Sequence, residues 1–169
     1  MDVFNFYRLD FSIRNLGIGV ISVFSVLASG QMPSLFYAFL ALVQILLIQM
    51  HSFSMNHYFD YKVWKEKNYI GKLIENGFQE RKILFLTLLP LLILVLTLPF
   101  SNKYVLLLFL YVILFFLYQS PQFRLKKHYL WSIILNSVCL GWILYAYPYL
   151  FLTGSFDLVF FTFSVIFLF

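Results

Sequence analysis

Long apolar runs, separated by short polar intervals, constrain this chain more than any other feature of its sequence. Of its 169 residues, 62% are hydrophobic and only 11% are charged, whereas a soluble domain carries about a quarter charged residues. Apolar runs of roughly 20 residues are long enough to cross a bilayer as α-helices. Because lipid cannot satisfy backbone polar groups, the sequence predicts an all-α, polytopic transmembrane helix bundle.

The apolar runs predict about six membrane segments within a single membrane domain that covers residues 1–169. The segments span residues 11–29, 34–55, 83–100, 104–119, 129–147 and 158–169. Pro90 lies inside the third segment, where we expect it to kink the helix, as membrane helices tolerate. Residues 148–157, which begin with a proline, are expected to form a connector.

The last apolar run is shorter than the others. It begins at Leu158 and reaches Phe169, whereas a membrane-spanning helix needs roughly 20 residues. It either forms a C-terminal hairpin that does not cross the membrane, or it belongs to a chain cut short of its natural partner segments. We favour the second interpretation and expect this chain to be the N-terminal part of a larger bundle.

Basic residues gather on one side of the predicted layout. If the segments alternate in direction, residues 1–14, 56–82 and 120–128 face the same side. Eleven of the twelve lysines and arginines lie there, and only Lys103 faces the other side. Cytoplasmic loops of membrane proteins carry such an excess. The sequence therefore predicts an integral, multi-pass membrane protein with a cytoplasmic N-terminus and cytoplasmic polar loops.

The net charge of +5 does not indicate binding to nucleic acid. The basic residues lie in short loops between apolar segments, where they determine topology and attract anionic lipid headgroups. Membrane lipid is therefore the expected partner, and no nucleic-acid partner is expected.

The polar interval after the second apolar run holds the residues best suited to chemistry. It opens on Asn56, His57 and Asp60, and residues 56–82 contain four of the chain's seven acidic residues. If the helix continues this far, Asn56 and Asp60 lie one turn apart on the same face. Their oxygens suit a hydrated Mg²⁺, and nearby lysines and arginines would neutralise a diphosphate.

A simpler interpretation of the same interval needs no ligand. Polar residues at the end of a membrane helix form a solvated boundary, and lysines there determine topology. Spacing alone favours this interpretation over a metal site.

Several segments of the chain resemble signatures of a known family. Asn-His-Tyr-Phe-Asp at 56–60, with the lysine-rich stretch that continues to Gly77, is similar to the first motif of the UbiA superfamily of intramembrane prenyltransferases, N-D-x-x-D-x-x-x-D. Residues 118–126 resemble the family's tyrosine–proline–lysine segment, and Arg14 is similar to its N-terminal arginine. The resemblance covers essentially the whole chain, in the same order.

The resemblance implies a UbiA-like fold, a reaction and a site. In the family, Mg²⁺ and aspartate-rich motifs bind the diphosphate of an isoprenyl donor, and the allylic cation formed on ionisation alkylates a lipophilic acceptor, either an aromatic ring or a lipid hydroxyl. Asn56 and Asp60 are the implied catalytic and metal-binding residues. The implied diphosphate-binding residues are Arg14, Lys72, Tyr118, Arg124 and Lys126.

The chain departs from the family motif at two positions. His57 and Trp64 stand where the family has aspartate, and a second aspartate motif does not occur in the sequence. The alternative is therefore a catalytically inactive relative, or a fragment that acts as an assembly partner with a second chain. A small transporter is a weaker candidate, because the polar residues gather at one mouth of the bundle rather than at the bilayer midplane.

Overall fold

The computed structural model describes residues 1–123 and 125–168, and all regular elements in these residues are helical. The helices are α1 (Val3–Phe6), α2 (Leu9–Ala28), α3 (Leu35–Trp64), α4 (Tyr69–Glu75), α5 (Glu80–Thr97), α6 (Leu106–Gln119), α7 (Tyr129–Asn136), α8 (Leu144–Thr153) and α9 (Leu158–Leu168). Three short 3-10 turns accompany them: η1 (Leu98–Phe100), η2 (Lys103–Val105) and η3 (Leu125–Lys127). The π-helical segment η4 (Ser137–Ile143) joins α7 to α8. The prediction of an all-α fold is confirmed.

Within the described residues, 4 helices are long and apolar enough to cross a membrane. They are Leu9–Ala28, Leu35–Trp64, Glu80–Phe100 and Tyr129–Thr153. The other two predicted segments form the shorter apolar helices Lys103–Gln119 and Leu158–Leu168.

Helix α3 extends beyond its expected end at residue 55. It continues through the polar motif to Trp64 and ends at Lys65, whose φ of 56° is left-handed. The Lys65 N–H donates to the carbonyl of Tyr61, and the Glu66 N–H donates to the carbonyl of Asp60, as in a left-handed helix cap. The polar motif is therefore helical, and its side chains project from a rigid element.

The prediction of a connector at residues 148–157 is wrong for residues 148–153, which are helical. Helix α8 contains Pro148 and continues to Thr153, and it ends at Gly154, whose φ is 70°. Proline is tolerated in membrane helices because surrounding groups satisfy the freed carbonyl. The left-handed conformation that stops the helix favours glycine.

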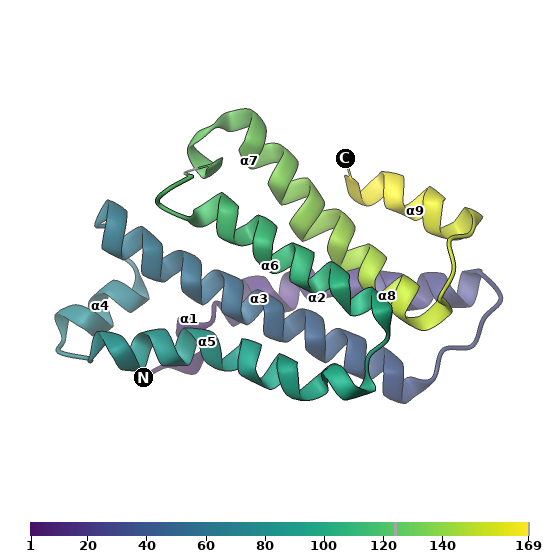
Figure 1. Cartoon of the computed structure of the whole chain (residues 1–169), viewed down its shortest axis with the longest axis horizontal. Coiled ribbons are helices and arrows are strands. Elements are labelled where there is room, and N and C mark those ends of the chain that lie inside the picture. Colours follow the sequence, from purple (N-terminus) through teal and green to yellow (C-terminus); the bar gives the residue numbers. More distant parts are fainter. Residues whose placement is uncertain (124, 169) are drawn as a thin grey trace.

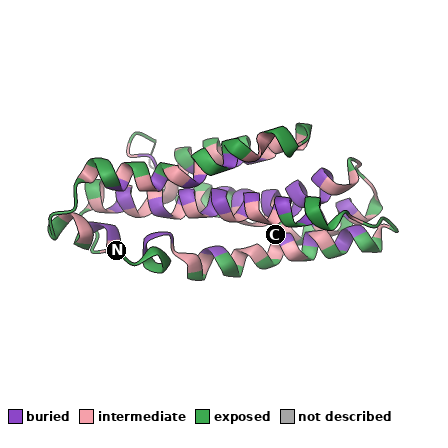
Figure 2. Ribbon diagram, turned by 90° about the horizontal axis from the view of Figure 1, so that it is seen from below, coloured by how far each residue is buried: buried purple, intermediate pink, exposed green. Residues whose placement is uncertain are grey.

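Helix α3 is the central element of the bundle. It packs against α2, α4, α5, α6 and α8, and the long helices run side by side in Figure 1. Its residues Ile45 and Ile48 form the main core with Tyr111 of α6 and Tyr147 of α8, and all four are 0% exposed. The ribbon in Figure 2 is coloured by burial, and exposed residues lie on the outer faces of the bundle.

Both polar loops lie at the same end of the bundle. In Figure 1 the C-terminal end of α3, the short helices α1 and α4, and the loop between α6 and α7 all gather at the left. We call this the basic end, formed by the described residues within 1–14, 56–82 and 120–128. The opposite end holds the α2–α3 turn and the α8–α9 connector. The arrangement agrees with the predicted pairing of the polar intervals.

Candidate functional site

A polar cavity of about 350 Å³ lies at the basic end, among α2, α3, α6, α7 and η4. Its polar lining comes from arginine, asparagine and tyrosine side chains, and its apolar lining is mostly aromatic. The polar lining residues are Arg8, Arg14, Asn15, Asn56, Tyr118 and Asn136, and the apolar ones are Phe11, Phe53, Phe115 and Leu140.

Three of the site residues predicted from the sequence line the polar cavity. Arg14, Asn56 and Tyr118 come from α2, α3 and α6, and all line it. Lys72 does not line it and is exposed on α4. Arg124 lies outside the described residues.

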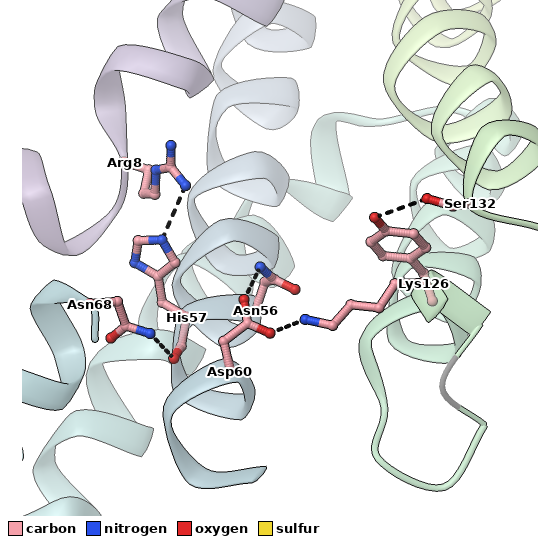
Figure 3. A network of polar contacts seen from close by, with 8 residues as sticks. Arg8, Asn56, His57, Asp60, Asn68, Lys126 and Ser132 are labelled. Atoms are coloured by element: carbon pink, nitrogen blue, oxygen red, sulfur yellow. Dashed lines mark hydrogen bonds and ion pairs between the residues drawn. The ribbon is translucent and has the colours of Figure 1, made fainter. Parts of the chain in front are cut away.

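Asp60 and Lys126 meet beside the polar cavity (Figure 3). Asp60 is only 7% exposed, and its Oδ1 forms an ion pair with the ammonium of Lys126 from η3. Its Oδ2 accepts a hydrogen bond from Nδ2 of Asn56 at 2.8 Å, which confirms the one-turn spacing. A buried carboxylate needs such partners, because an isolated buried charge is strongly disfavoured.

The contacts of the Asp60 carboxylate oxygens determine how well the site suits Mg²⁺. Both carboxylate oxygens of Asp60 face a donor, so the remaining oxygen of the pair is Oδ1 of Asn56, which is buried and has no partner among the described residues. Mg²⁺ requires near-octahedral oxygen coordination, and the described residues contain no group of three or more His, Cys, Asp or Glu side chains that could hold a metal. The residues as arranged do not fit the ion, and the Mg²⁺ prediction rests on the resemblance alone.

His57 holds an arginine at the polar cavity. Nη1 of Arg8 lies 3.1 Å from Nε2 of His57. Because a guanidinium only donates hydrogen bonds, Nε2 must be the acceptor, and the imidazole is neutral with its proton on Nδ1. The backbone carbonyl of His57 accepts a hydrogen bond from Nδ2 of Asn68 at 2.8 Å, which ties the segment before α4 to α3 (Figure 3).

The segment that carries Arg8 is fixed from both sides. The hydroxyl of Tyr7 donates to the carbonyl of Leu86 at 2.8 Å, and burial raises the pKa of this tyrosine. Arg8 itself has a left-handed φ of 50°, and its guanidinium lies 3.7 Å from the ring centroid of Phe11. The guanidinium of Arg14 lies 5.1 Å from the same centroid.

The electrostatics of the polar cavity favour an anion. Two guanidinium groups line it, and none of its described lining residues is acidic. Aromatic rings beside cations add cation–π attraction, and guanidinium groups match the geometry of phosphate oxygens. The arrangement is suited to binding a phosphorylated group whose apolar part contacts the aromatic wall.

The loop that carries Lys126 has a second attachment to α3. Nζ of Lys127 lies 3.8 Å from the ring centroid of Trp64, at the C-terminal end of α3. The hydroxyl of Tyr118, at the end of α6 where this loop begins, lies 3.5 Å from Oγ of Ser132.

Sequence reasoning missed Arg8, Asn15 and Asn136. The two asparagines lie inside apolar runs, and polar side chains in membrane segments are functional candidates by default because they are energetically expensive there. That signal was present in the sequence. The role of Arg8 had no local signal, since its partner His57 lies 49 residues away.

Comparison of the chain with protein-family models, with curated proteins and with solved structures found no match.

Proposed function

We propose that this chain binds a prenyl diphosphate at the basic end and transfers its isoprenyl group to an aromatic or lipid hydroxyl acceptor. The observation that carries the proposal is the polar cavity, in which Arg14, Asn56 and Tyr118 lie together with Arg8. Motif residues far apart in sequence thus share one anion-attracting site.

An apolar groove next to the polar cavity supports an amphipathic substrate. The groove has a volume of about 360 Å³ between α3, α5 and α6, and Phe115 lines both spaces. Its rim residues Leu88, Ile113 and Phe116 are exposed on the apolar outer surface. The diphosphate would lie against the guanidinium groups of the cavity. The isoprenyl tail would lie in the groove, which opens toward the lipid.

The chain's own residues would assist ionisation of the donor. The carbon–oxygen bond to the diphosphate breaks, and its electron pair leaves with the diphosphate, whose charge Arg8 and Arg14 would stabilise. The allylic cation would lie near the aromatic wall of the cavity, where ring faces stabilise positive charge. The acceptor then forms a bond to the allylic carbon and releases a proton to water.

A second candidate is binding without transfer, as in an inactive relative or an assembly partner. The engagement of Asp60 by Lys126 and Asn56 favours this alternative, because both carboxylate oxygens already face a donor. The two candidates predict the same ligand and differ only in the product.

One experiment separates them. The purified chain, in lipid nanodiscs, would be given a radiolabelled prenyl diphosphate and a lipid extract, and bound label and labelled lipid product would both be measured. We expect Arg14→Gln and Asp60→Ala to abolish the product, while Lys103→Gln, which removes the same charge at the opposite end, leaves it unchanged. Binding without product would favour the inactive relative, and absence of binding would exclude both candidates.

The proposal includes the membrane layout, a UbiA-like bundle of about six segments with the basic end in the cytoplasm. Cys139 is buried, so we expect it not to react with thiol reagents that label an introduced cysteine. Lys127→Cys should react from the cytoplasmic side only, and Lys103→Cys from the opposite side only. Labelling of both positions from one side would contradict the layout.

A further inference from the structure

Each of three motif positions on α3 holds a basic side chain that comes from another segment. These positions correspond to the aspartates of the resembling family, which are expected to contact metal. The pairs are His57 with Arg8, Asp60 with Lys126, and Trp64 with Lys127.

We propose that this chain binds diphosphate without a divalent metal, and that the basic side chains held by the motif supply the positive charge instead. This inference rests on the proposed function, since it concerns the same ligand and the same polar cavity. It goes further by assigning the work of the metal to Arg8 and Lys126.

The substituted positions suit cations better than metals. The lone pair of Nε2 on His57, which a metal would need, already accepts from Arg8 at 3.1 Å. The ring of Trp64 has no lone pair for a metal, but its face attracts the ammonium of Lys127 at 3.8 Å. Both departures from the family pattern therefore replace a negatively charged ligand with a neutral group that can bind a cation.

The remaining aspartate is also committed to a cation. Lys126 pairs with Oδ1 of Asp60, and its side chain is 19% exposed. The ammonium thus takes the place at this carboxylate that a metal would require. Asn56 links the pair to the polar cavity, because it donates to Asp60 and also lines the cavity.

The charge at the cavity is sufficient to attract a diphosphate. Arg8 and Arg14 line the cavity, and Lys126 is held beside it through Asp60 and Asn56. Charge-assisted hydrogen bonds from these groups to phosphate oxygens are stronger than neutral ones. Together with the single carboxylate of Asp60, these three cations leave a net positive charge beside the ligand without a divalent ion.

The test is calorimetric titration of inorganic pyrophosphate into the full chain in nanodiscs, once in EDTA and once in Mg²⁺. We expect binding in EDTA to be at least as tight as in Mg²⁺. Lys126→Met and Arg8→Gln should each weaken binding in EDTA roughly tenfold, as expected for the loss of one charge-assisted contact. Lys103→Met, at the opposite end, should bind as the unaltered chain does.

The outcomes distinguish this inference from the proposed function. Pyrophosphate binding that requires Mg²⁺ would overturn the inference and leave the proposed function standing. Tight binding in EDTA by both the Lys126→Met and Arg8→Gln variants would also overturn it, because other groups would then hold the ligand. Absence of binding in both buffers would overturn both proposals. A thermal melt of each variant would show whether its fold is retained, and Arg8→Gln keeps the test usable if Lys126→Met unfolds.

Discussion

Two sets of buried polar side chains, one toward each end of the bundle, differ in how their hydrogen bonds are satisfied. Toward the end opposite the basic one, the Gln44 side chain is 0% exposed, and its Nε2 donates to Oγ1 of Thr97 at 2.7 Å and to Oγ of Ser101 at 2.8 Å. Its Oε1 accepts from the hydroxyl of Tyr147. We call these four residues the Gln44 cluster.

The basic end has charged residues and unpaired polar atoms instead. Oδ1 of Asn56 and Nδ1 of His57 are buried and have no hydrogen-bond partner in the described part of the chain. Arginine and lysine side chains lie beside them. Buried polar groups are nearly always paired, so a satisfied network indicates a structural role, whereas unpaired groups beside cations indicate a place for a ligand.

The largest effect on stability is expected in the Gln44 cluster. Gln44→Leu removes three hydrogen bonds and leaves the buried hydroxyl of Tyr147 without this acceptor. We expect the free energy of unfolding to fall by about 2 kcal/mol, measured by denaturant unfolding in micelles. Pyrophosphate affinity should stay unchanged, because the cluster does not line the polar cavity.

Gln49 provides a matched control on the same helix. It is also 0% exposed, but neither side-chain polar atom has a partner among the described residues. Gln49→Leu therefore removes an unsatisfied polar group and should be neutral or stabilising. Equal destabilisation by both substitutions would show that the Gln44 network adds nothing beyond the volume of the side chain.

A smaller stability effect is expected from the ion pair at the basic end. Lys126→Met leaves Asp60 without its cation, and Asp60→Asn in the same chain removes the stranded charge. The side chains are 19% and 10% exposed, so solvent screens part of the interaction. We expect a coupling energy of about 1 kcal/mol in a double-mutant cycle on unfolding. Strictly additive effects would mean that the pair does not stabilise the fold.

Local patterns predicted the helices and one part of the site. The apolar runs identified the long helices, and the i, i+4 spacing of Asn56 and Asp60 correctly placed them on one face of α3. Pro148 was misinterpreted as a helix end, because the sequence does not show which neighbours satisfy a carbonyl in the folded bundle.

Partners across the bundle had no sequence signal. The contact of Lys126 with Asp60 joins residues 66 positions apart, and the contact of Arg8 with His57 joins residues 49 positions apart. A carboxylate beside an asparagine has the same local pattern whether its partner is a metal or a lysine. Only the position of η3, whose Lys126 side chain reaches Asp60 on α3, determines which of the two meets Asp60.

The smallest effect is expected where the loop after α6 is attached to Trp64. Trp64→Leu removes the aromatic face under Lys127, which lies 3.8 Å from the ring centroid, and Trp64→Phe keeps a smaller one. We expect Trp64→Leu to lower the free energy of unfolding by about 0.5 kcal/mol, and Trp64→Phe to lower it less.

This pair of variants sharpens the contrast between the two ends. If the attachment serves to position cations for a ligand, Trp64→Leu should weaken pyrophosphate binding about twofold, in line with its small energetic effect, although the side chain lies outside the polar cavity. Gln44→Leu, with the larger loss of stability, should leave that affinity unchanged. Stability and affinity would then vary independently at the two ends. If the affinity of both variants instead followed their stability, the basic end would be one more structural network.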